Sequence, residues 1–206
     1  MIQLLDLPPS RFLWIEEPAQ FAHLTLPSEA IHSWSGYAPE FQAMCAHLAK
    51  NAQKLCAKQS TYSKIFLVYS KARGNAQLIN EPLFEEFFSK QGFQMVSPET
   101  LPLSLQIYLV FHADEIAGTI GTATHLAMFA RCKTKFYGLI RIREIVVFPQ
   151  LLINQMAGLE SYIVDVSFNF LPSLRNTELK ISFSPMILKI LLNLFGEKMF
   201  YYLFKN

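Results

Sequence analysis

The spacing of hydrophobic positions changes along the chain and separates a helical first part from an alternating second part. Between about residues 39 and 58, apolar side chains recur at intervals of three, four and seven, which predicts one amphipathic helix. Its predicted buried face comprises Phe41, Met44, Cys45, Leu48 and Leu55. From residue 64 onward, short continuous apolar runs alternate with helical patterns. Such runs are typical of strands buried on both faces of a parallel sheet. The alternation predicts an α/β fold with a doubly wound, Rossmann-like parallel sheet.

The expected elements divide the chain into three regions. Strands are expected near residues 64–69, 93–96, 113–117, 135–140 and 161–165, and helices near 80–91, 103–110, 123–131 and 150–157. Two earlier apolar runs, residues 12–15 and 22–26, are interpreted as strands or strand-like connectors. We therefore predict an N-terminal connector and helix (1–61), a Rossmann-like domain (62–175) and an apolar, helical C-terminal tail (176–206).

The composition is that of a folded protein without a strongly charged surface. Hydrophobic residues make up 51% of the chain and charged residues 17%, with a formal net charge of +2. Disorder and nucleic-acid binding are therefore both disfavoured. No uncharged apolar run reaches the roughly 20 residues that a membrane-spanning helix needs, and the first residues lack the pattern of a signal peptide. The expected location is the cytoplasm, either free or peripheral at the inner face of the membrane.

The cysteines do not indicate a disulfide or metal framework. Cys45, Cys56 and Cys132 are few and scattered, and no Cys-x-x-Cys pair occurs. This pattern favours free thiols in a reducing compartment and no structural zinc site. No metal ligand set is predicted.

A glycine-containing turn after the third expected strand is the first candidate for chemistry. Gly118, Thr119, Gly121 and Thr122 fall between the strand near 113–117 and the helix near 123–131. Glycines allow a close approach of the backbone to a ligand, and the first amides of a helix suit a phosphate. The alternative is a tight turn whose glycines serve packing only, and spacing alone does not decide between the two. His125 follows one helical turn later and is either a core residue or a catalytic base.

Two further candidates follow the first expected strand. Ser70, Lys71 and Arg73 emerge where that strand ends, so the two cations could neutralise a diphosphate; the alternative is an ordinary solvated loop. Glu81 begins the next helix, where a carboxylate complements the helix dipole, binds sugar hydroxyls or acts as a base.

Several of these pieces occur in an order that resembles a known family. The segments are Leu7-Pro-Pro-Ser-Arg-Phe12, Glu17-Pro18, Leu26-Pro27-Ser28, Lys64-Ile-Phe-Leu67, Ser70-Lys-Ala-Arg73, Asn80-Glu81, Gly92-Phe93, Pro98-Glu99, Leu103-Ser104, Gln106, Ala113, Ile116-Ala-Gly118, Gly121 and Phe129. Together they resemble the catalytic half of glycosyltransferase family 61, which includes capsular polysaccharide biosynthesis proteins. The resemblance extends over roughly residues 5–170.

The resemblance implies a fold like the C-terminal half of a GT-B glycosyltransferase. It further implies a nucleotide-sugar donor, expected to be UDP-linked, and metal-independent, inverting transfer to a capsular or surface glycan. Ser70, Lys71, Arg73, Gly118, Thr119, Gly121 and Thr122 would then hold the donor, and Glu81 or His125 would act as the base. Val68-Tyr69 stands where members usually have Ser-Arg, and Thr119-Ile120-Gly121 stands where they have Pro-His-Gly. Members are also usually longer, with another Rossmann-like domain upstream.

These departures keep a second hypothesis open. In the first hypothesis, the chain is a glycosyltransferase or the donor-binding part of one. In the second, it is a truncated, non-catalytic relative that binds a nucleotide or a partner protein. In the second case the apolar tail would dock a partner subunit or a membrane surface; the alternative is a final helix packed on the chain's own sheet.

Overall fold

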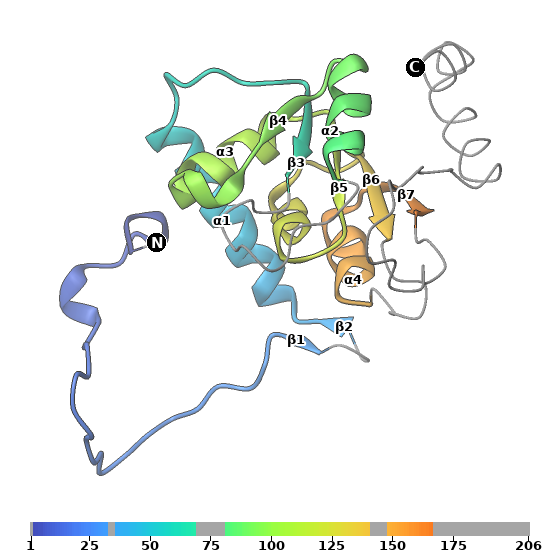
Figure 1. Ribbon diagram of the computed structural model, residues 1–206. Helices are drawn as coiled ribbons and strands as arrows, with labels where there is room; N and C mark the ends of the chain where they lie inside the picture. The colour runs from blue at the N-terminus through green and yellow to red at the C-terminus, as the bar shows by residue number, and fades with distance from the viewer. Residues whose placement is uncertain (1, 33–35, 69–80, 141–147, 167–206) are drawn as a thin grey trace, which may run out of the picture.

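The computed structural model describes residues 2–32, 36–68, 81–140 and 148–166 (Figure 1). Its centre is a sheet of five strands in the order β4-β3-β5-β6-β7, and every neighbouring pair is parallel. The strands are β3 (Lys64–Leu67), β4 (Gln94–Val96), β5 (Glu115–Thr119), β6 (Lys135–Ile140) and β7 (Glu160–Asp165). Strands alternate with helices along the chain, as the hydrophobic pattern predicts. The fold is thus α/β with a doubly wound, Rossmann-like parallel sheet.

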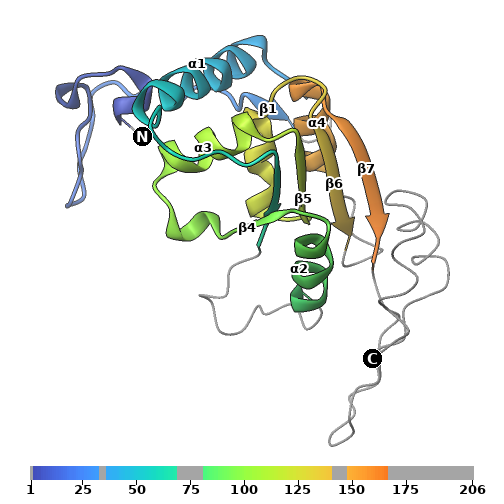
Figure 2. The same cartoon turned by 90° about the horizontal axis from the view of Figure 1, so that it is seen from above.

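Helices cover the two faces of the sheet unequally. The connections after β3 are α2 (Glu81–Lys90), η3 (Pro98–Thr100) with α3 (Leu103–His112), the 3₁₀ helix η4 (Thr122–Phe129), and α4 (Phe148–Ala157). The chain first passes from β3 out to the edge strand β4 and then returns across the sheet to β5. Because right-handed crossovers are the rule, this reversal places α2 on one face and the later helices on the other. Among the helices that the structure describes, Figure 2 shows α2 by itself on one side of the sheet, opposite α1, α3 and α4.

Each face of the sheet has its own apolar core. Ile65, Leu67, Ile116 and Phe136 belong to the core that α1, α3 and α4 cover. Phe66, Ala117, Tyr137, Leu139, Phe84 and Phe88 belong to the core under α2. Successive strand residues point to opposite faces, so the two cores interleave along each strand. This double burial explains why the strands are continuous apolar runs in the sequence.

Helix α1 (Pro39–Leu55) packs on α3 and η4 through a narrower stripe than predicted. Cys45 and Leu48 are buried, as expected, but Met44 is 40% and Leu55 53% exposed. The central positions of the stripe are instead the fully packed Ala49 and Ala52. Small side chains bring the helix close to its neighbours, so larger residues beside them remain at the rim. Helix α1 shares the core of the sheet, and the boundary at residue 61 stays a prediction.

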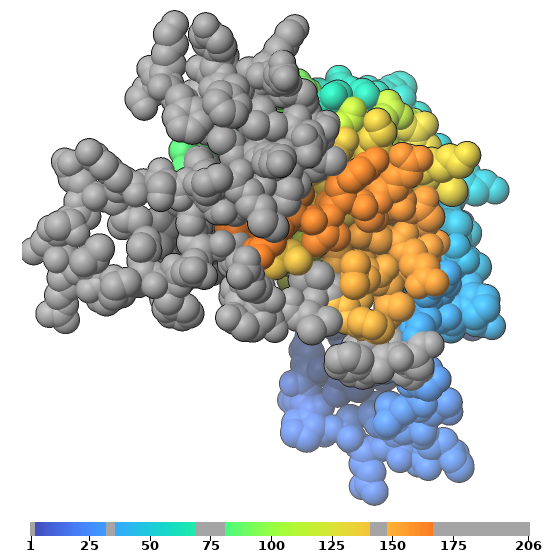
Figure 3. All heavy atoms as spheres, turned by 90° about the vertical axis from the view of Figure 1, so that its right-hand side faces the viewer, coloured from blue at the N-terminus to red at the C-terminus, as the bar shows by residue number. Residues whose placement is uncertain are grey.

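The described residues before α1 form only short elements: η1 (Ile2–Leu5), η2 (Pro9–Arg11), and the antiparallel pair β1 (Ile31–His32) and β2 (Gly36–Tyr37). Of the two interpretations of residues 12–15 and 22–26, the one as strands is wrong, because both runs are irregular and exposed connectors. A strand needs a neighbour for its backbone groups, and here none pairs with them in the described residues. Figure 3 shows this segment, in blue, standing out from the body.

No helix within the described ranges has both the length and the apolar character of a membrane span. The proposed helical tail, 176–206, lies outside the described residues, as do Ser70, Lys71, Arg73 and Asn80.

Candidate active site at the carboxyl edge of the sheet

The strand order creates one place where ligands are expected to bind. β3 and β5 are neighbours, yet the chain leaves β3 toward β4 and leaves β5 toward β6. In parallel α/β sheets, a crevice opens beyond the carboxyl ends of two strands whose connections diverge in this way. Leu67 and Gly118 pair across β3 and β5 at that end. The candidate residues of β5, η4 and α2 all come from segments that begin or end at this edge.

Gly118 lies inside β5 and not in the turn that the sequence suggested. A Cβ atom there would lie 3.0 Å from the Leu67 carbonyl oxygen and 3.0 Å from Thr124 Cγ2. A side chain larger than hydrogen would therefore force the strand backbone or Thr124 to shift by a few tenths of an ångström. Packing accounts for this glycine, and any role of Gly118 in ligand binding stays a prediction.

The turn at Gly121 is held by hydrogen bonds to the side chain and the backbone of Thr124. Its N–H donates to Thr124 Oγ1 at 3.1 Å, and the Thr124 N–H donates to the Gly121 carbonyl at 3.1 Å. The Ile120 N–H is also used, since it donates to the Leu139 carbonyl at 2.9 Å. Two of the amides that the sequence offered to a phosphate thus have partners within the protein.

The helix that follows is a 3₁₀ helix, not the α-helix expected over 123–131. Thr122 is exposed and Ala123 half-buried in its first turn, where a helix supplies no internal acceptor for the N–H groups. An anion at this edge could accept hydrogen bonds from these two amides. The candidate phosphate-binding amides are therefore those of Thr122 and Ala123, not that of Gly121. The role of Thr122 as a donor-binding residue stays a prediction.

Thr119 is the last residue of β5, and its hydroxyl has an unusual environment. The side chain is only 3% exposed, and Oγ1 has no hydrogen-bond partner in the described structure. Thr119 pairs with Leu139, which belongs to the core on the α2 face. A buried hydroxyl without a partner costs about 1–3 kcal/mol. Such a cost at the expected binding edge favours a ligand that supplies the missing hydrogen bond.

Glu81 lies at the same end of the same face. It is the first residue of α2 and only 5% exposed. α2 packs through Phe84 and Phe88 on the core that also contains Ala117, two residues before Thr119. The partial positive charge of a helix N-terminus stabilises a carboxylate in this position. Glu81 and Thr119 therefore belong to the same face of the sheet, that of α2, and both lie toward its carboxyl edge.

His125 approaches the edge from the opposite face, in η4. Its ring is half-buried, and this burial lowers the pKa of the imidazole below its ordinary value. Desolvation disfavours the charged form, so the ring is neutral at neutral pH and can accept a proton. The structure places Glu81 and His125 on different faces of the sheet, so they do not form one catalytic pair. Either one alone remains a candidate base.

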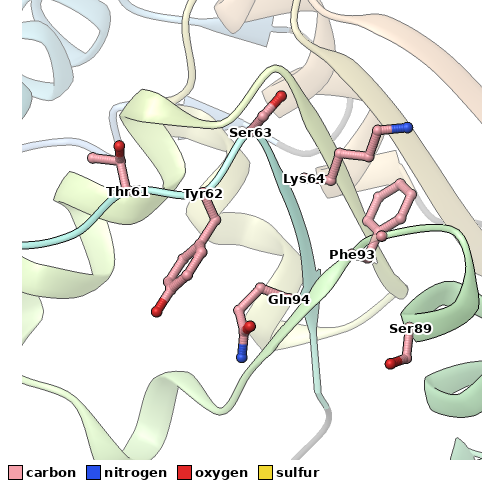
Figure 4. A pocket seen from close by; sticks show the side chains of 8 residues that line it. Thr61, Tyr62, Ser63, Lys64, Ser89, Phe93 and Gln94 are labelled. Atoms are coloured by element: carbon pink, nitrogen blue, oxygen red, sulfur yellow. The ribbon is translucent and has the colours of Figure 1, made fainter.

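A hollow at the opposite, amino edge offers less chemistry. A shallow cavity of about 610 Å³ is lined by Tyr62, Ser63, Lys64, Phe93 and Gln94, among others (Figure 4). Its charged group is already paired, since Lys64 Nζ lies 3.0 Å from Glu115 and 5.4 Å from the centre of the Phe93 ring. No cluster of three metal-ligating side chains occurs in the part of the chain that the structure describes.

Sequence reasoning missed two residues that shape the carboxyl edge. Thr124 and Gln150 are 0% and 1% exposed and are hydrogen-bonded to each other. A threonine three residues after the turn glycine was the available signal, because such side chains often bond back to the start of a helix. No local pattern pointed to Gln150, which lies 26 residues away from its partner.

A comparison with known protein families adds an independent finding. The family model described as Glycosyltransferase 61 matches residues 6–137, more than half of the chain. The match includes β3, β4 and β5, whereas α4 and β7 lie beyond it. It therefore contains the switch point, the place between β3 and β5 where the connections of two neighbouring strands diverge. No curated protein matches the sequence.

Proposed function

The chain belongs to glycosyltransferase family 61, and on that premise we propose that it transfers a sugar from a nucleotide-sugar donor to a glycan acceptor. We place the donor at the carboxyl edge between β3 and β5. The observation that carries this placement is the Thr119 hydroxyl, which is 3% exposed and lacks a partner among the described residues. A phosphate or sugar oxygen in the crevice would satisfy it.

The proposed reaction is a single displacement at the anomeric carbon of the donor. The acceptor hydroxyl oxygen forms the new bond, the bond from carbon to the phosphate oxygen breaks, and the nucleoside diphosphate leaves with the electron pair. The protein's main task is to stabilise the negative charge of that leaving group. The first-turn amides of Thr122 and Ala123 suit this task, and Lys71 and Arg73 are proposed to add positive charge.

A base must accept the proton of the attacking hydroxyl. His125 is suited by its chemistry, because burial lowers the pKa of its imidazole and keeps the ring neutral at neutral pH. Glu81 is suited by its place at the start of α2, on the face of the sheet to which Thr119 also belongs. The two candidates predict different variants: His125→Gln removes turnover if the histidine is the base, and Glu81→Gln removes it if the carboxylate is. Nucleotide binding should survive in the variant that has lost only its base.

The identity of the donor and acceptor is the finer part of the proposal. The resemblance to capsular polysaccharide biosynthesis proteins supports a UDP-linked donor and a capsular or surface glycan acceptor. The free thiols Cys45, Cys56 and Cys132 fit a reducing cytoplasm, where nucleotide-sugars are used.

Calorimetric titration with UDP tests the donor site. We expect Thr119→Val, which keeps the shape and removes the hydroxyl, to weaken binding about 10-fold, as the loss of one hydrogen bond of ~1.4 kcal/mol implies. Thr119→Ser should bind like the wild type. The matched control is Thr134→Val, because Thr134 is an equally buried threonine at the amino edge. A wild-type protein that binds neither UDP nor another nucleoside diphosphate at millimolar concentration would exclude this function.

A second candidate function is nucleotide binding without transfer. The Gly121 amide supports it, because its bond to Thr124 removes one donor from the phosphate site. In that case UDP binds at the same edge, but no donor sugar is released in the presence of acceptor glycans.

A further inference from the structure

A buried chain of hydrogen bonds connects the Gly121 turn to helix α4. The Gly121 N–H donates to Thr124 Oγ1 at 3.1 Å, and the Thr124 hydroxyl lies 2.8 Å from Gln150 Oε1. Gln150 Nε2 then donates to Asn154 Oδ1 at 2.8 Å. The three side chains are 0%, 1% and 4% exposed. The network therefore lies in a medium where hydrogen bonds are strong and substitutes from water are absent.

The donors and acceptors of each group limit how this chain of hydrogen bonds can be arranged. A threonine hydroxyl has a single hydrogen, and here its oxygen accepts from the Gly121 amide. That hydrogen can point to Gln150 Oε1 or to the Gly121 carbonyl, which both lie 2.8 Å away. Gln150 supplies the acceptor on one side and uses its amide hydrogen on the other. Without Gln150, the hydroxyl would have only the turn itself as a partner.

The methyl group of Thr124 also restricts the position of this side chain, because it packs beside Gly118. It fills the space beside Gly118, where a Cβ atom would lie 3.0 Å from Thr124 Cγ2. Thr124 thus lies against Gly118 of β5 with its methyl group and bonds to the Gly121 turn with its hydroxyl. Thr124 therefore links strand β5 to the Gly121 turn. Gln150 of α4 holds the Thr124 side chain in this position through its hydrogen bond.

We propose that Thr124, oriented by Gln150, is a positioning residue for the donor site. By occupying the Gly121 amide, it fixes the turn so that the following amides, of Thr122 and Ala123, face the nucleoside diphosphate. This inference rests on the proposed function, because it concerns the same donor. It adds a specific device: a buried network from α4 that pre-orients backbone donors, which raises affinity by reducing the ordering needed on binding.

Two measurements on Thr124→Val test the device. The variant keeps the shape of the side chain and removes the hydroxyl. Amide hydrogen exchange should show faster exchange at Gly121, and calorimetry should show UDP binding about 10-fold weaker, the equivalent of ~1.4 kcal/mol. The KM for the donor should rise in turnover assays, while the KM for the acceptor stays unchanged. Thr124→Ser, which keeps the hydroxyl, should retain binding within about two-fold.

Gln150→Met provides the second arm. It removes the acceptor from α4 but leaves Thr124 in place, so UDP binding should weaken by about 3-fold to 5-fold, less than in Thr124→Val. Because both changes break the same chain, the double variant should bind no more weakly than Thr124→Val alone. Thr134→Val, a buried threonine outside the network, should bind UDP like the wild type.

The outcomes separate this inference from the proposed function. If the wild type binds UDP and the folded Thr124→Val variant binds it equally well, the positioning role is wrong and the donor site stands. If Thr124→Val does not fold, wild-type affinity in Gln150→Met leads to the same conclusion. A wild type that binds no nucleoside diphosphate overturns both proposals.

Discussion

The two edges of the sheet are built from the same strands but use their polar residues differently. At the amino edge, charged side chains are paired with each other: Lys64 with Glu115 at 3.0 Å, and Arg131 with Asp114 at 2.6 Å. At the carboxyl edge, the hydroxyl of Thr119 is buried without a partner in the described structure. The first edge gains modest stability from its polar groups, whereas the second keeps a polar group unsatisfied at a cost.

The direction of a parallel sheet explains this division. All strands begin at one edge and end at the other, so the loops at the two edges can evolve separately. Only the carboxyl edge of the described sheet contains the switch point between β3 and β5, which is where parallel α/β sheets generally bind ligands. Polar groups that serve a ligand are therefore expected at one edge, and polar groups that serve the fold at the other.

The largest effect is expected for Gly118→Val, which breaks the packing under the carboxyl edge. A Cβ atom at this position lies 3.0 Å from a backbone oxygen of β3, which cannot move without the strand. We expect the free energy of unfolding to fall by about 3 kcal/mol, at the upper end for overpacked cores. Denaturant titration measures the change. Gly118→Ala should lose less, and wild-type stability in the valine variant would show that the edge is less tightly packed than described.

Thr119→Val and Thr134→Val should change stability in opposite directions. Thr119 loses a hydroxyl without a described partner, so its variant should gain about 1 kcal/mol. Thr134 Oγ1 donates to the Ala113 carbonyl at 3.3 Å near the amino edge, so its variant should lose about 1 kcal/mol.

Thermal unfolding of both proteins without ligand gives the sign of each change. A gain at Thr119 combined with weaker UDP binding would identify a residue retained for function at the expense of stability. If both variants lose stability equally, the difference between the two edges disappears.

The sequence predicts the sheet well because each strand carries its own signal. Residues 65–67 and 136–140 are without charged side chains on either face, and this local pattern predicts a strand covered by two layers. The end of β5 could not be predicted in the same way. Gly118 suggests a turn in isolation, but pairing with Leu67 on one side and Gly138 on the other continues the strand to Thr119.

The candidate site was predictable in its place but not in its detail. The switch point follows from the order of elements, so residues around Gly121 could be singled out from the sequence. The network of Thr124 and Gln150 depends on two helices that meet only in the folded protein. The exposure of Met44 was equally hidden, because it depends on how closely the alanines of α1 approach their neighbours.

A smaller effect is expected for His125, at the carboxyl edge, on how the free energy of unfolding depends on pH. Burial lowers the pKa of its imidazole, so the unfolded chain binds a proton more readily than the folded protein. The stabilising contribution of the neutral ring is present above the ordinary histidine pKa of about 6.5 and is lost as the pH falls below it. His125→Gln should therefore flatten the decline in stability between about pH 7 and 5.

Chemical denaturation at several pH values measures this slope. His23→Gln is the control, because His23 is exposed in the irregular N-terminal segment and should leave the slope unchanged. An unchanged slope in His125→Gln would mean that the ring is solvated and the carboxyl edge is more open than its burial indicates.

The smallest effect belongs to the ion pair of the amino edge. The Ser63 hydroxyl donates to Asp114 at 2.8 Å, and this bond, with the Arg131 guanidinium, holds the pKa of the carboxyl below its ordinary value. Since the pair is largely exposed, Asp114→Asn should lower the free energy of unfolding by no more than about 1 kcal/mol. The contribution is complete at neutral pH and is lost as the pH falls below the ordinary aspartate value of about 4.

Salt and pH together locate this contribution. Because exposed pairs are screened, the difference between wild type and Asp114→Asn should shrink at 1 M salt. The same variant should leave UDP binding unchanged, since Asp114 precedes β5 and Thr119 ends it. A change in nucleotide affinity would mean that the two edges are coupled through the strand. If the two edges have separate roles, Asp114→Asn should cause a small, salt-sensitive loss of stability and leave the affinity for UDP unchanged.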